Sequence, residues 1–297
     1  TRGLEGLERV RAKEKPEVLL VQGDTTTVFS GALAAFYQGV KVGHVEAGLR
    51  SGNIYSPYPE EANRMLTGIL AEYHFCPTIR NKENLLRENY PEDKLYITGN
   101  TVIDALQYVV KDEYIFDNGL LNKIDYENKR VILLTSHRRE NIGKAMENIF
   151  SAVNDIVNKY DDVEVVFPVH LNPRVREIAK GILGSNEKVH LIDPLDYEPF
   201  TNLMNRVYLV VTDSGGLQEE APTLGKPVLV VREETERPEG IEAGTAKLVG
   251  TEYKSVYDNL DFLLSNEAEY TKMAKAVNPY GDGTAAKKIV DILLNAN

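Results

Sequence analysis

Three carboxylates in the first part of the chain stand where they could give or take a proton. Asp24 and Glu46 each lie just beyond an apolar, strand-like run, and Glu60 follows Pro59, which can begin a helix. Ligands of open parallel sheets bind beyond the carboxyl ends of the strands. The positions of Asp24 and Glu46 therefore predict general acid or base chemistry at one rim of a sheet.

Each of these acids also has an ordinary structural explanation. Asp24 precedes three threonines and could cap a helix. Glu60 and Glu61 could be surface acids that match a helix dipole. Glu46 has no obvious capping duty between Val45 and Ala47, so the alternative for it is an ion pair with Arg50.

A glycine turn in the second half of the chain predicts an anion site. The apolar run 207–211 leads into Asp213-Ser214-Gly215-Gly216. Ser214 can cap the following helix and bond a phosphate oxygen, while the N–H groups of Gly215 and Gly216 point the same way. The alternative is a plain turn with a helix cap. The pattern suggests a nucleotide that is held without a metal ion.

Further polar residues follow strands or open helices in the same half. Glu220 lies where an acid could accept hydrogen bonds from two ribose hydroxyls, and Arg237 before Pro238 suits a phosphate or a carboxylate. His137 follows one strand-like run and His170 follows the next. The alternative for His170 is an ordinary turn in which the histidine ring makes its hydrogen bonds within the protein.

Composition and missing motifs exclude several functions. A net charge of −11 argues against non-specific nucleic-acid binding. No G-x-G-x-x-G or Walker motif follows a strand, and no His or Asp cluster has metal-ligand spacing, so we expect no cofactor and no metal. The single cysteine, Cys76, fits a reducing compartment, and no apolar run reaches the ~18 residues of a membrane span. We expect a soluble, cytoplasmic protein.

The elements that must position these residues alternate almost without exception between apolar, β-rich runs and helical patterns. Near-continuous Val, Ile and Leu runs indicate strands that are covered on both faces. The predicted fold is α/β, with two Rossmann-like, doubly wound parallel sheets. We place an N-terminal domain at 1–111 and a C-terminal domain at 112–283, and expect the last helix, within 284–297, to pack back on the first domain.

Seven ordered motifs closely resemble those of the non-hydrolysing UDP-N-acetylglucosamine 2-epimerases. They are Val21-Gln22-Gly23-Asp24-Thr25-Thr26-Thr27, His44-Val45-Glu46-Ala47-Gly48-Leu49-Arg50, Pro59-Glu60-Glu61-Ala62-Asn63-Arg64, Gly99-Asn100-Thr101, His137-Arg138-Arg139-Glu140, Asp213-Ser214-Gly215-Gly216-Leu217-Gln218-Glu219-Glu220-Ala221-Pro222 and Thr235-Glu236-Arg237-Pro238. The resemblance implies a glycosyltransferase-B-like fold, in which the two domains face a cleft, and interconversion of UDP-GlcNAc and UDP-ManNAc for cell-surface polysaccharide.

The resemblance also implies a mechanism and roles for the residues. Such enzymes eliminate UDP to give 2-acetamidoglucal and then add UDP back after protonation from the other face. Asp24, Glu46 and Glu60 would be the catalytic carboxylates, and which of them serves which face is left open. His137 would be a further essential residue near the diphosphate.

The nucleotide roles implied by the resemblance fall in the second half. Ser214, Gly215, Gly216 and Arg237 would hold the diphosphate, Glu220 the ribose, and Phe200 would lie by the uracil. Arg138 and His170 are candidates for binding a second UDP-GlcNAc as an activator. Members of the family are commonly dimers, so we expect a homodimer.

The sequence departs from the resemblance at its start and leaves alternatives open. Family members begin with a strand and a Gly-Thr-Arg-Pro-Glu loop, which this sequence does not contain, so it resembles a member without its first βαβ region. The alternatives are a hydrolysing epimerase that releases ManNAc and UDP, a glycosyltransferase of the same fold, and a non-catalytic nucleotide-sugar sensor.

Overall fold

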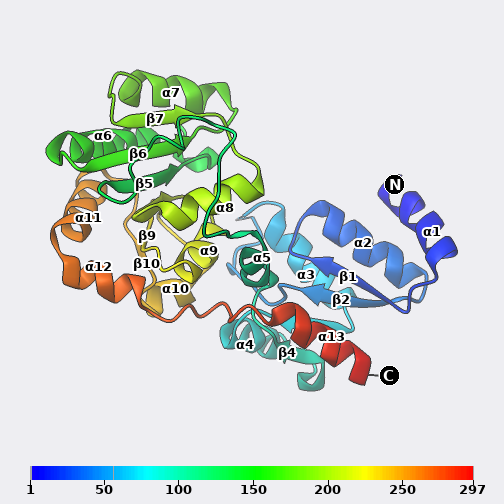
Figure 1. The fold of residues 1–297 in the computed structure, drawn as a ribbon. Coiled ribbons are helices and arrows are strands. Elements are labelled where there is room, and N and C mark those ends of the chain that lie inside the picture. Colours follow the sequence, from blue (N-terminus) through cyan, green and yellow to red (C-terminus); the bar gives the residue numbers. More distant parts are fainter. Residues whose placement is uncertain (1, 56, 297) are drawn as a thin grey trace. The chain divides into compact units, whose positions relative to one another are not determined.

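The structure, a computed structural model, describes residues 2–55 and 57–296. The chain divides into two compact units, one made of Thr1–Ala105 with Tyr280–Asn297 and the other of Leu106–Pro279. Each unit is built on its own parallel sheet (Figure 1). The predicted α/β fold with two parallel sheets is therefore confirmed.

The first unit has a four-stranded sheet in the order β1-β2-β3-β4, and all its described strand pairs are parallel. Its strands are β1 (Val18–Gln22), β2 (Lys41–Val45), β3 (Tyr73–Cys76) and β4 (Leu95–Ile97). Its helices are α1 (Arg2–Glu14), α2 (Thr26–Tyr37), α3 (Glu60–Leu70), α4 (Ile79–Arg87), α5 (Thr101–Val109), which runs on into the second unit, and α13 (Ala285–Asn295), with a short 3-10 turn at Glu92–Lys94.

Helices cover both faces of this sheet, as the unbroken apolar runs require. On one face, Val21 and Val42 pack against the small residues Ala32 and Ala35 of α2. On the other face, Ile289 of α13 packs in one cluster with residues of β2 and β3. Figure 1 shows α2 and α3 on one side of the sheet and α13 on the other.

The second unit has a six-stranded parallel sheet in the order β10-β9-β8-β5-β6-β7. Its strands are β5 (Arg130–Thr135), β6 (Val163–Pro168), β7 (Val189–Ile192), β8 (Leu209–Thr212), β9 (Val228–Val230) and β10 (Ala246–Leu248). Its helices are α6 (Lys144–Lys159), α7 (Pro173–Leu183), α8 (Tyr197–Arg206), α9 (Leu217–Thr223), α10 (Pro238–Glu242), α11 (Tyr253–Ser265) and α12 (Glu267–Ala274), with a 3-10 turn at Arg139–Asn141.

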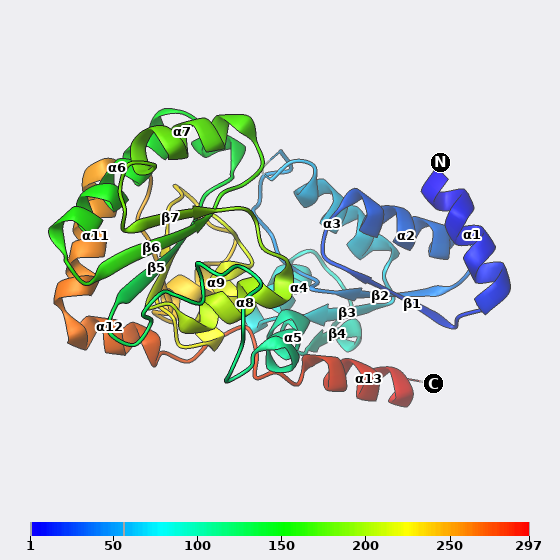
Figure 2. The same cartoon turned by 45° about the horizontal axis from the view of Figure 1, so that its top comes forward.

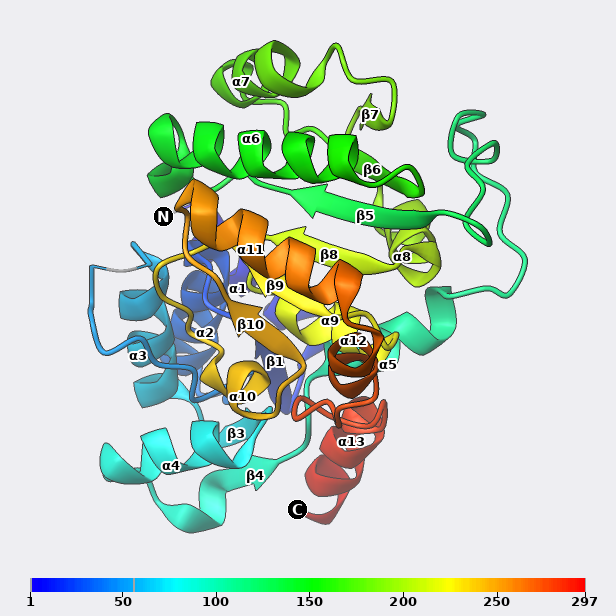
Figure 3. The same cartoon turned by 90° about the vertical axis from the view of Figure 1, so that its left-hand side faces the viewer.

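The large core of the second unit lies on one face of its sheet, under α6, α7 and α11. Ile132 and Leu134 of β5 point into this core, and because strand side chains alternate, Leu133 between them faces the opposite layer. Figures 2 and 3 show α6, α7 and α11 on one side of the sheet, with α8 and α9 on the other. The order β8-β5 brings the ends of two strands that are far apart in the chain side by side.

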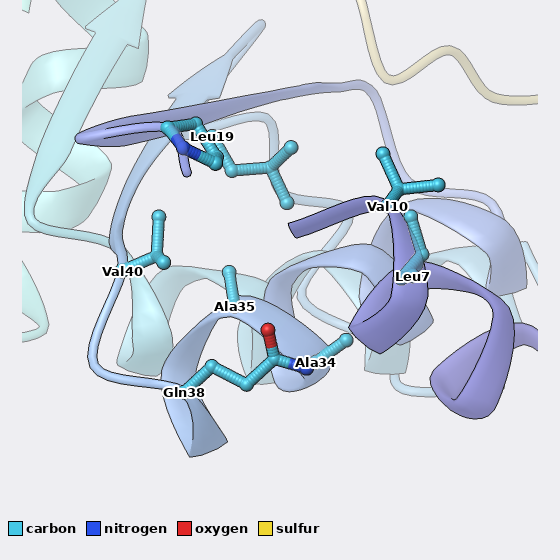
Figure 4. Close-up of a pocket in the computed structure, with 8 residues that line it drawn as sticks. Leu7, Val10, Leu19, Ala34, Ala35, Gln38 and Val40 are labelled. Carbon is cyan, nitrogen blue, oxygen red and sulfur yellow. The ribbon is translucent and has the colours of Figure 1, made fainter. Parts of the chain in front are cut away.

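An apolar pocket lies in the first unit between α1, α2 and β1 (Figure 4). Leu7 and Val10 of α1 line one side of it, and Leu19 and Val40 line the other. Gln38 supplies the only polar side chain among its lining residues. A charged nucleotide needs several polar partners, so this pocket is not the site that the sequence predicts.

None of the helices within the described ranges is long and apolar enough to cross a membrane.

Candidate active site

Asp24 and Glu46 come together at the carboxyl ends of two neighbouring strands. Gln22 of β1 pairs in register with Val45 of β2, and the N–H of Gly23 donates to the Val45 carbonyl at 3.1 Å. A Cβ atom added to Gly23 would lie 3.5 Å from Oε2 of Glu46. The Glu46 carboxylate thus lies against the turn that carries Asp24.

Glu46 has an unusual backbone conformation for its residue type. Its φ is 66°, in the left-handed region, which costs a non-glycine residue roughly 1–2 kcal/mol. Such strain persists where the surroundings enforce it and is concentrated at functional sites. Arg50, the alternative partner considered for Glu46, forms a bidentate ion pair with Glu88 at 2.7 and 2.8 Å.

Asp24 does not cap the following helix, because Thr25 does so by accepting the N–H of Val28 at 3.3 Å. Instead, two residues of α3 donate hydrogen bonds to Asp24. Nη2 of Arg64 donates to its Oδ2 at 2.5 Å, and the amide of Asn63 donates to its carbonyl at 3.0 Å. The capping explanation for Asp24 is therefore wrong.

Glu60 opens α3 and is half-buried, one helical turn before Asn63 and Arg64. Residues three and four apart lie on the same side of a helix, so Glu60 shares a side of α3 with the two residues that hold Asp24. The structure thus brings Asp24, Glu46 and Glu60 to one end of the first unit.

His44, which opens the second of the seven motifs, also lies beside these acids, although a histidine inside a strand-like run is expected in the core. It is buried in β2, and its Nε2 lies 2.8 Å from the carbonyl of Gly23. Burial lowers the pKa of His44 to about 4, so the ring is neutral at pH 7 and must carry its proton on Nε2 to donate to that carbonyl. His44 thereby fixes the Gly23 turn between Asp24 and Glu46.

In the second unit, the buried carboxylate of Asp213 organises the loop that carries His137. The backbone N–H groups of His137 and Arg138 donate to Asp213 Oδ2 at 2.9 and 3.0 Å. Ser136 Oγ and the amide of Asn141 donate to the same oxygen at 3.0 and 3.1 Å. Sequence reasoning included Asp213 in the glycine turn but gave it no role, although its place directly after β8 is the available signal.

The structure corrects the predicted role of Ser214 as a helix cap. Gly216, and not Ser214, is the N-cap residue of α9. The N–H of Ser214 donates to Oγ1 of Thr212 at 2.8 Å. The reason is spacing, since two glycines separate Ser214 from the first helical residue and the helix begins beyond the reach of its hydroxyl.

Gly215 and Arg237 meet directly. A Cβ atom on Gly215 would lie 2.4 Å from Nη1 of Arg237 and 2.7 Å from Oε1 of Glu236. Arg237 Nε donates to Glu219 at 2.5 Å, and Nη1 donates to Glu236 at 2.7 Å. Burial opposes ionisation of Glu236, but the charges of Arg237 and Arg232 outweigh it and lower its pKa to about 2. Glycine at 215 is what lets the guanidinium lie over the turn.

Glu220 lies beside the other glycine of the turn, with its Oε2 3.9 Å from the position of a Cβ on Gly216. Burial raises the pKa of Glu220 to about 7, and the charge of Glu219 adds to this shift while a hydrogen bond with Tyr197 opposes it. Phe200, the predicted uracil neighbour, is half-buried three residues after Tyr197 in α8. Tyr197 is a contact of Glu220 that sequence reasoning missed.

His137 and His170 lie side by side although they follow different strands. Their rings stack with centroids 5.8 Å apart, and Nδ1 of His137 lies 3.2 Å from Asp213. Nδ1 of His170 accepts the N–H of Asn172 at 3.1 Å. Arg138 Nη2 lies 3.6 Å from Glu236, which links this pair to the Arg237 cluster. His137, Arg138, His170 and Arg237 are thus connected through contacts with one another, with Asp213 and with Glu236.

The elevated pKa of Glu220 predicts a pH-dependent cost in stability. Because the folded pKa lies above the ordinary value of 4.5, folding favours the protonated form, and the stability of the fold falls as pH rises from about 4.5 to 7. We expect Glu220→Gln to stabilise the protein by on the order of 2–3 kcal/mol at pH 8 and by little at pH 4.5. Denaturant unfolding at the two pH values measures this difference.

The control is Glu177→Gln, at an exposed position of α7, which should give the same small change in stability at both pH values. An effect of Glu220→Gln that does not depend on pH would contradict the raised pKa of Glu220.

In the part of the chain that the structure describes, neither unit contains a metal cluster. Among the described ranges, no group of three or more His, Cys, Asp and Glu side chains could hold a metal ion. In the first unit the Asp24 carboxylate is paired with Arg64, and in the second unit Glu219 and Glu236 are paired with Arg237. This arrangement suits proton transfer in one unit and binding of an anion in the other.

Comparison with known proteins identifies the family of this chain. The family described as UDP-N-acetylglucosamine 2-epimerase matches residues 1–294. A Bacillus subtilis (strain 168) protein named UDP-N-acetylglucosamine 2-epimerase is 54% identical over 280 residues, which are 94% of this chain and 73% of the relative.

Two solved structures are similar over nearly the whole chain. A UDP-GlcNAc 2-epimerase from Neisseria meningitidis, bound to UDP-GlcNAc, is 48% identical with a TM-score of 0.92, and the match covers 99% of this chain and 80% of that one. A co-structure of S. aureus MnaA with UDP is 50% identical with a TM-score of 0.94, and the match covers 100% of this chain and 81% of that one. This chain belongs to the UDP-N-acetylglucosamine 2-epimerase family.

Proposed function

We propose that this chain is a non-hydrolysing UDP-GlcNAc 2-epimerase that interconverts UDP-GlcNAc and UDP-ManNAc. The observation that carries the proposal is the pair of carboxylates, Asp24 and Glu46, at adjacent strand ends of the first unit. Family membership and the UDP-GlcNAc bound to the Neisseria meningitidis relative support it.

The chemistry explains why such carboxylates are needed. The hydrogen at C2 of the sugar is not acidified by a carbonyl, so simple abstraction and return of this proton would be slow. Anti elimination avoids the problem, because a base takes the C2 proton while the C1–O bond breaks and UDP leaves with the bonding electrons. Protonation of the resulting 2-acetamidoglucal at C2 from the other face, with return of UDP to C1, gives the epimer. One acid or base group is required on each face.

We assign the proton transfers to Asp24, Glu46 and Glu60 and the retention of UDP to the second unit. Arg237, lying over Gly215, would hold the diphosphate, and Glu220 would accept the ribose hydroxyls. Charge-assisted hydrogen bonds stabilise the departing diphosphate and keep it in place for its return. Ser214 and Gly216 would line the same turn, with His137 near the diphosphate and Phe200 by the uracil.

Finer features of the activity are also proposals. Arg138 and His170, which stand beside His137 in the second unit, are candidates to bind a second UDP-GlcNAc as an activator. We further propose a homodimer that works in the cytoplasm.

Incubation with UDP-GlcNAc in D2O tests the proposed reaction. We expect UDP-ManNAc that carries deuterium at C2, detected by NMR and mass spectrometry, because the proton taken by one group exchanges with solvent before the other face is protonated. UDP-ManNAc without deuterium would contradict elimination. Free ManNAc with an equal amount of UDP would instead identify a hydrolysing enzyme.

A further inference from the structure

The two adjacent acids at the start of α3 have different environments. Glu60 is half-buried, whereas the side chain of Glu61 is 1% exposed. Glu61 Oε1 accepts the backbone N–H groups of Ser51 and Gly52 at 3.0 and 3.1 Å, and Oε2 accepts Nη1 of Arg64 at 2.8 Å. Glu61 therefore connects the loop before α3 to Arg64.

Arg64 is also almost fully buried, and its guanidinium binds a carboxylate on each side. Its side chain is 5% exposed, and its two terminal nitrogens bond Glu61 and Asp24 respectively. The planar guanidinium fixes the direction of both bonds, which a lysine ammonium would not do. The Asp24 carboxylate, 30% exposed, is thereby held by a group that is itself held by Glu61.

The energetics indicate that Arg64 is not there for stability alone. Its Nε is buried and has no hydrogen-bond partner among the described residues, and an unmade buried hydrogen bond costs about 1–3 kcal/mol. Buried ion pairs are also often no more stabilising than apolar packing of the same volume. An apolar side chain at position 64 would stabilise the fold without these costs. Orientation of a carboxylate, in contrast, requires a rigid hydrogen-bond donor.

We propose that Arg64 and Glu61 are positioning residues that set the direction of the Asp24 carboxylate for proton transfer at C2. Glu61 fixes the guanidinium of Arg64 and, through Ser51 and Gly52, the loop that leads into Glu60. The inference rests on the proposed epimerase function, since it assigns a geometric requirement to one of its acids. A displacement of a reacting group by about 1 Å can cost on the order of a hundredfold in rate.

A double-mutant cycle with Asp24 tests the proposal in the full chain. Arg64→Lys keeps the charge but loses the planar guanidinium with its two directed donors. We therefore expect the rate of C2 deuterium exchange to fall about 30-fold or more, with the affinity for UDP within about twofold.

The double variant separates positioning from a general structural role. Because Arg64 acts through Asp24, the variant that combines Asp24→Asn and Arg64→Lys should be no slower than Asp24→Asn alone. Arg87→Lys, at an exposed ion pair of α4, should leave exchange unchanged. Effects that multiply in the double variant, or a matching loss of UDP affinity, would show a general structural role and overturn the proposal.

A second measurement does not depend on activity and uses a milder variant. With 13C-labelled aspartate, the carboxyl resonance of Asp24 should shift in Arg64→Lys and also in Glu61→Gln, while Arg87→Lys leaves it in place. An unshifted resonance in Glu61→Gln would overturn the link between Glu61 and Asp24. If the wild-type chain shows no C2 exchange, the proposed function fails, and this resonance still decides whether Arg64 and Glu61 orient the carboxylate.

Discussion

Replacing Asp24 with asparagine is expected to lower kcat and C2 deuterium exchange by about a thousandfold while leaving the affinity for UDP within about twofold. The amide keeps the size of the side chain and can still contact Arg64, but it cannot take or return a proton. Asp24 lies in the first unit, whereas the residues proposed to hold UDP lie in the second, so binding and chemistry should separate. Exchange followed by NMR and UDP titration calorimetry measure the two effects.

The matched control for this variant is Asp93→Asn, which makes the same chemical change at an exposed position of the first unit. It should alter neither exchange nor binding. Retention of full exchange by Asp24→Asn would show that the proton at C2 is handled by another group, and the division of labour between the two units would be wrong.

Gly215→Ala is expected to weaken UDP binding by about 10- to 100-fold without unfolding the protein. The new Cβ would lie 2.4 Å from Nη1 of Arg237, so the guanidinium must move away from the turn. The atoms that it meets, on Arg237 and Glu236, are the ends of flexible side chains, and for this reason the fold should survive. Loss of one hydrogen bond to a charged group, at about 1.5–3 kcal/mol, gives the expected range.

Gly181→Ala provides the control for this substitution, because a Cβ at that position of α7 meets nothing within 4 Å. Both variants should unfold cooperatively, and only Gly215→Ala should lose UDP affinity in calorimetry. Unchanged affinity in Gly215→Ala would mean that the position of Arg237 over the turn does not matter for the nucleotide.

The fold could be predicted from the sequence because its signals are local and consistent. Unbroken apolar runs such as Val131-Ile132-Leu133-Leu134 indicate strands that are covered on both faces, and this run proved to lie in β5, where all four side chains are buried. The candidate acids could be found for the same reason, since each stands just past a strand or at the start of a helix.

Tertiary contacts of buried polar residues could not be predicted in this way. The sequence allowed Glu61 to be a surface acid and gave Arg64 no role, yet both are almost fully buried and contact residues about ten to forty positions away. His44 reads as a core residue and is one, but its ring nitrogen bonds the Gly23 carbonyl. Periodicity predicts which side of an element is buried and carries no information about which buried polar groups pair. The prediction that Ser214 caps α9 was wrong for a related reason, because the exact first residue of a helix is set by its contacts.

The buried carboxylate of Asp213 has a consequence for the order in which the protein folds. It follows β8, and the donors that it gathers follow β5, 72 to 77 residues earlier in the chain. These hydrogen bonds can form only after β5 and β8 have paired, and pairings between such distant segments are slow to form because a long loop must first be closed. The loop of His137 is therefore among the last parts of the second unit to become ordered, and a nascent or partly unfolded chain will acquire its helices well before this loop takes its folded conformation.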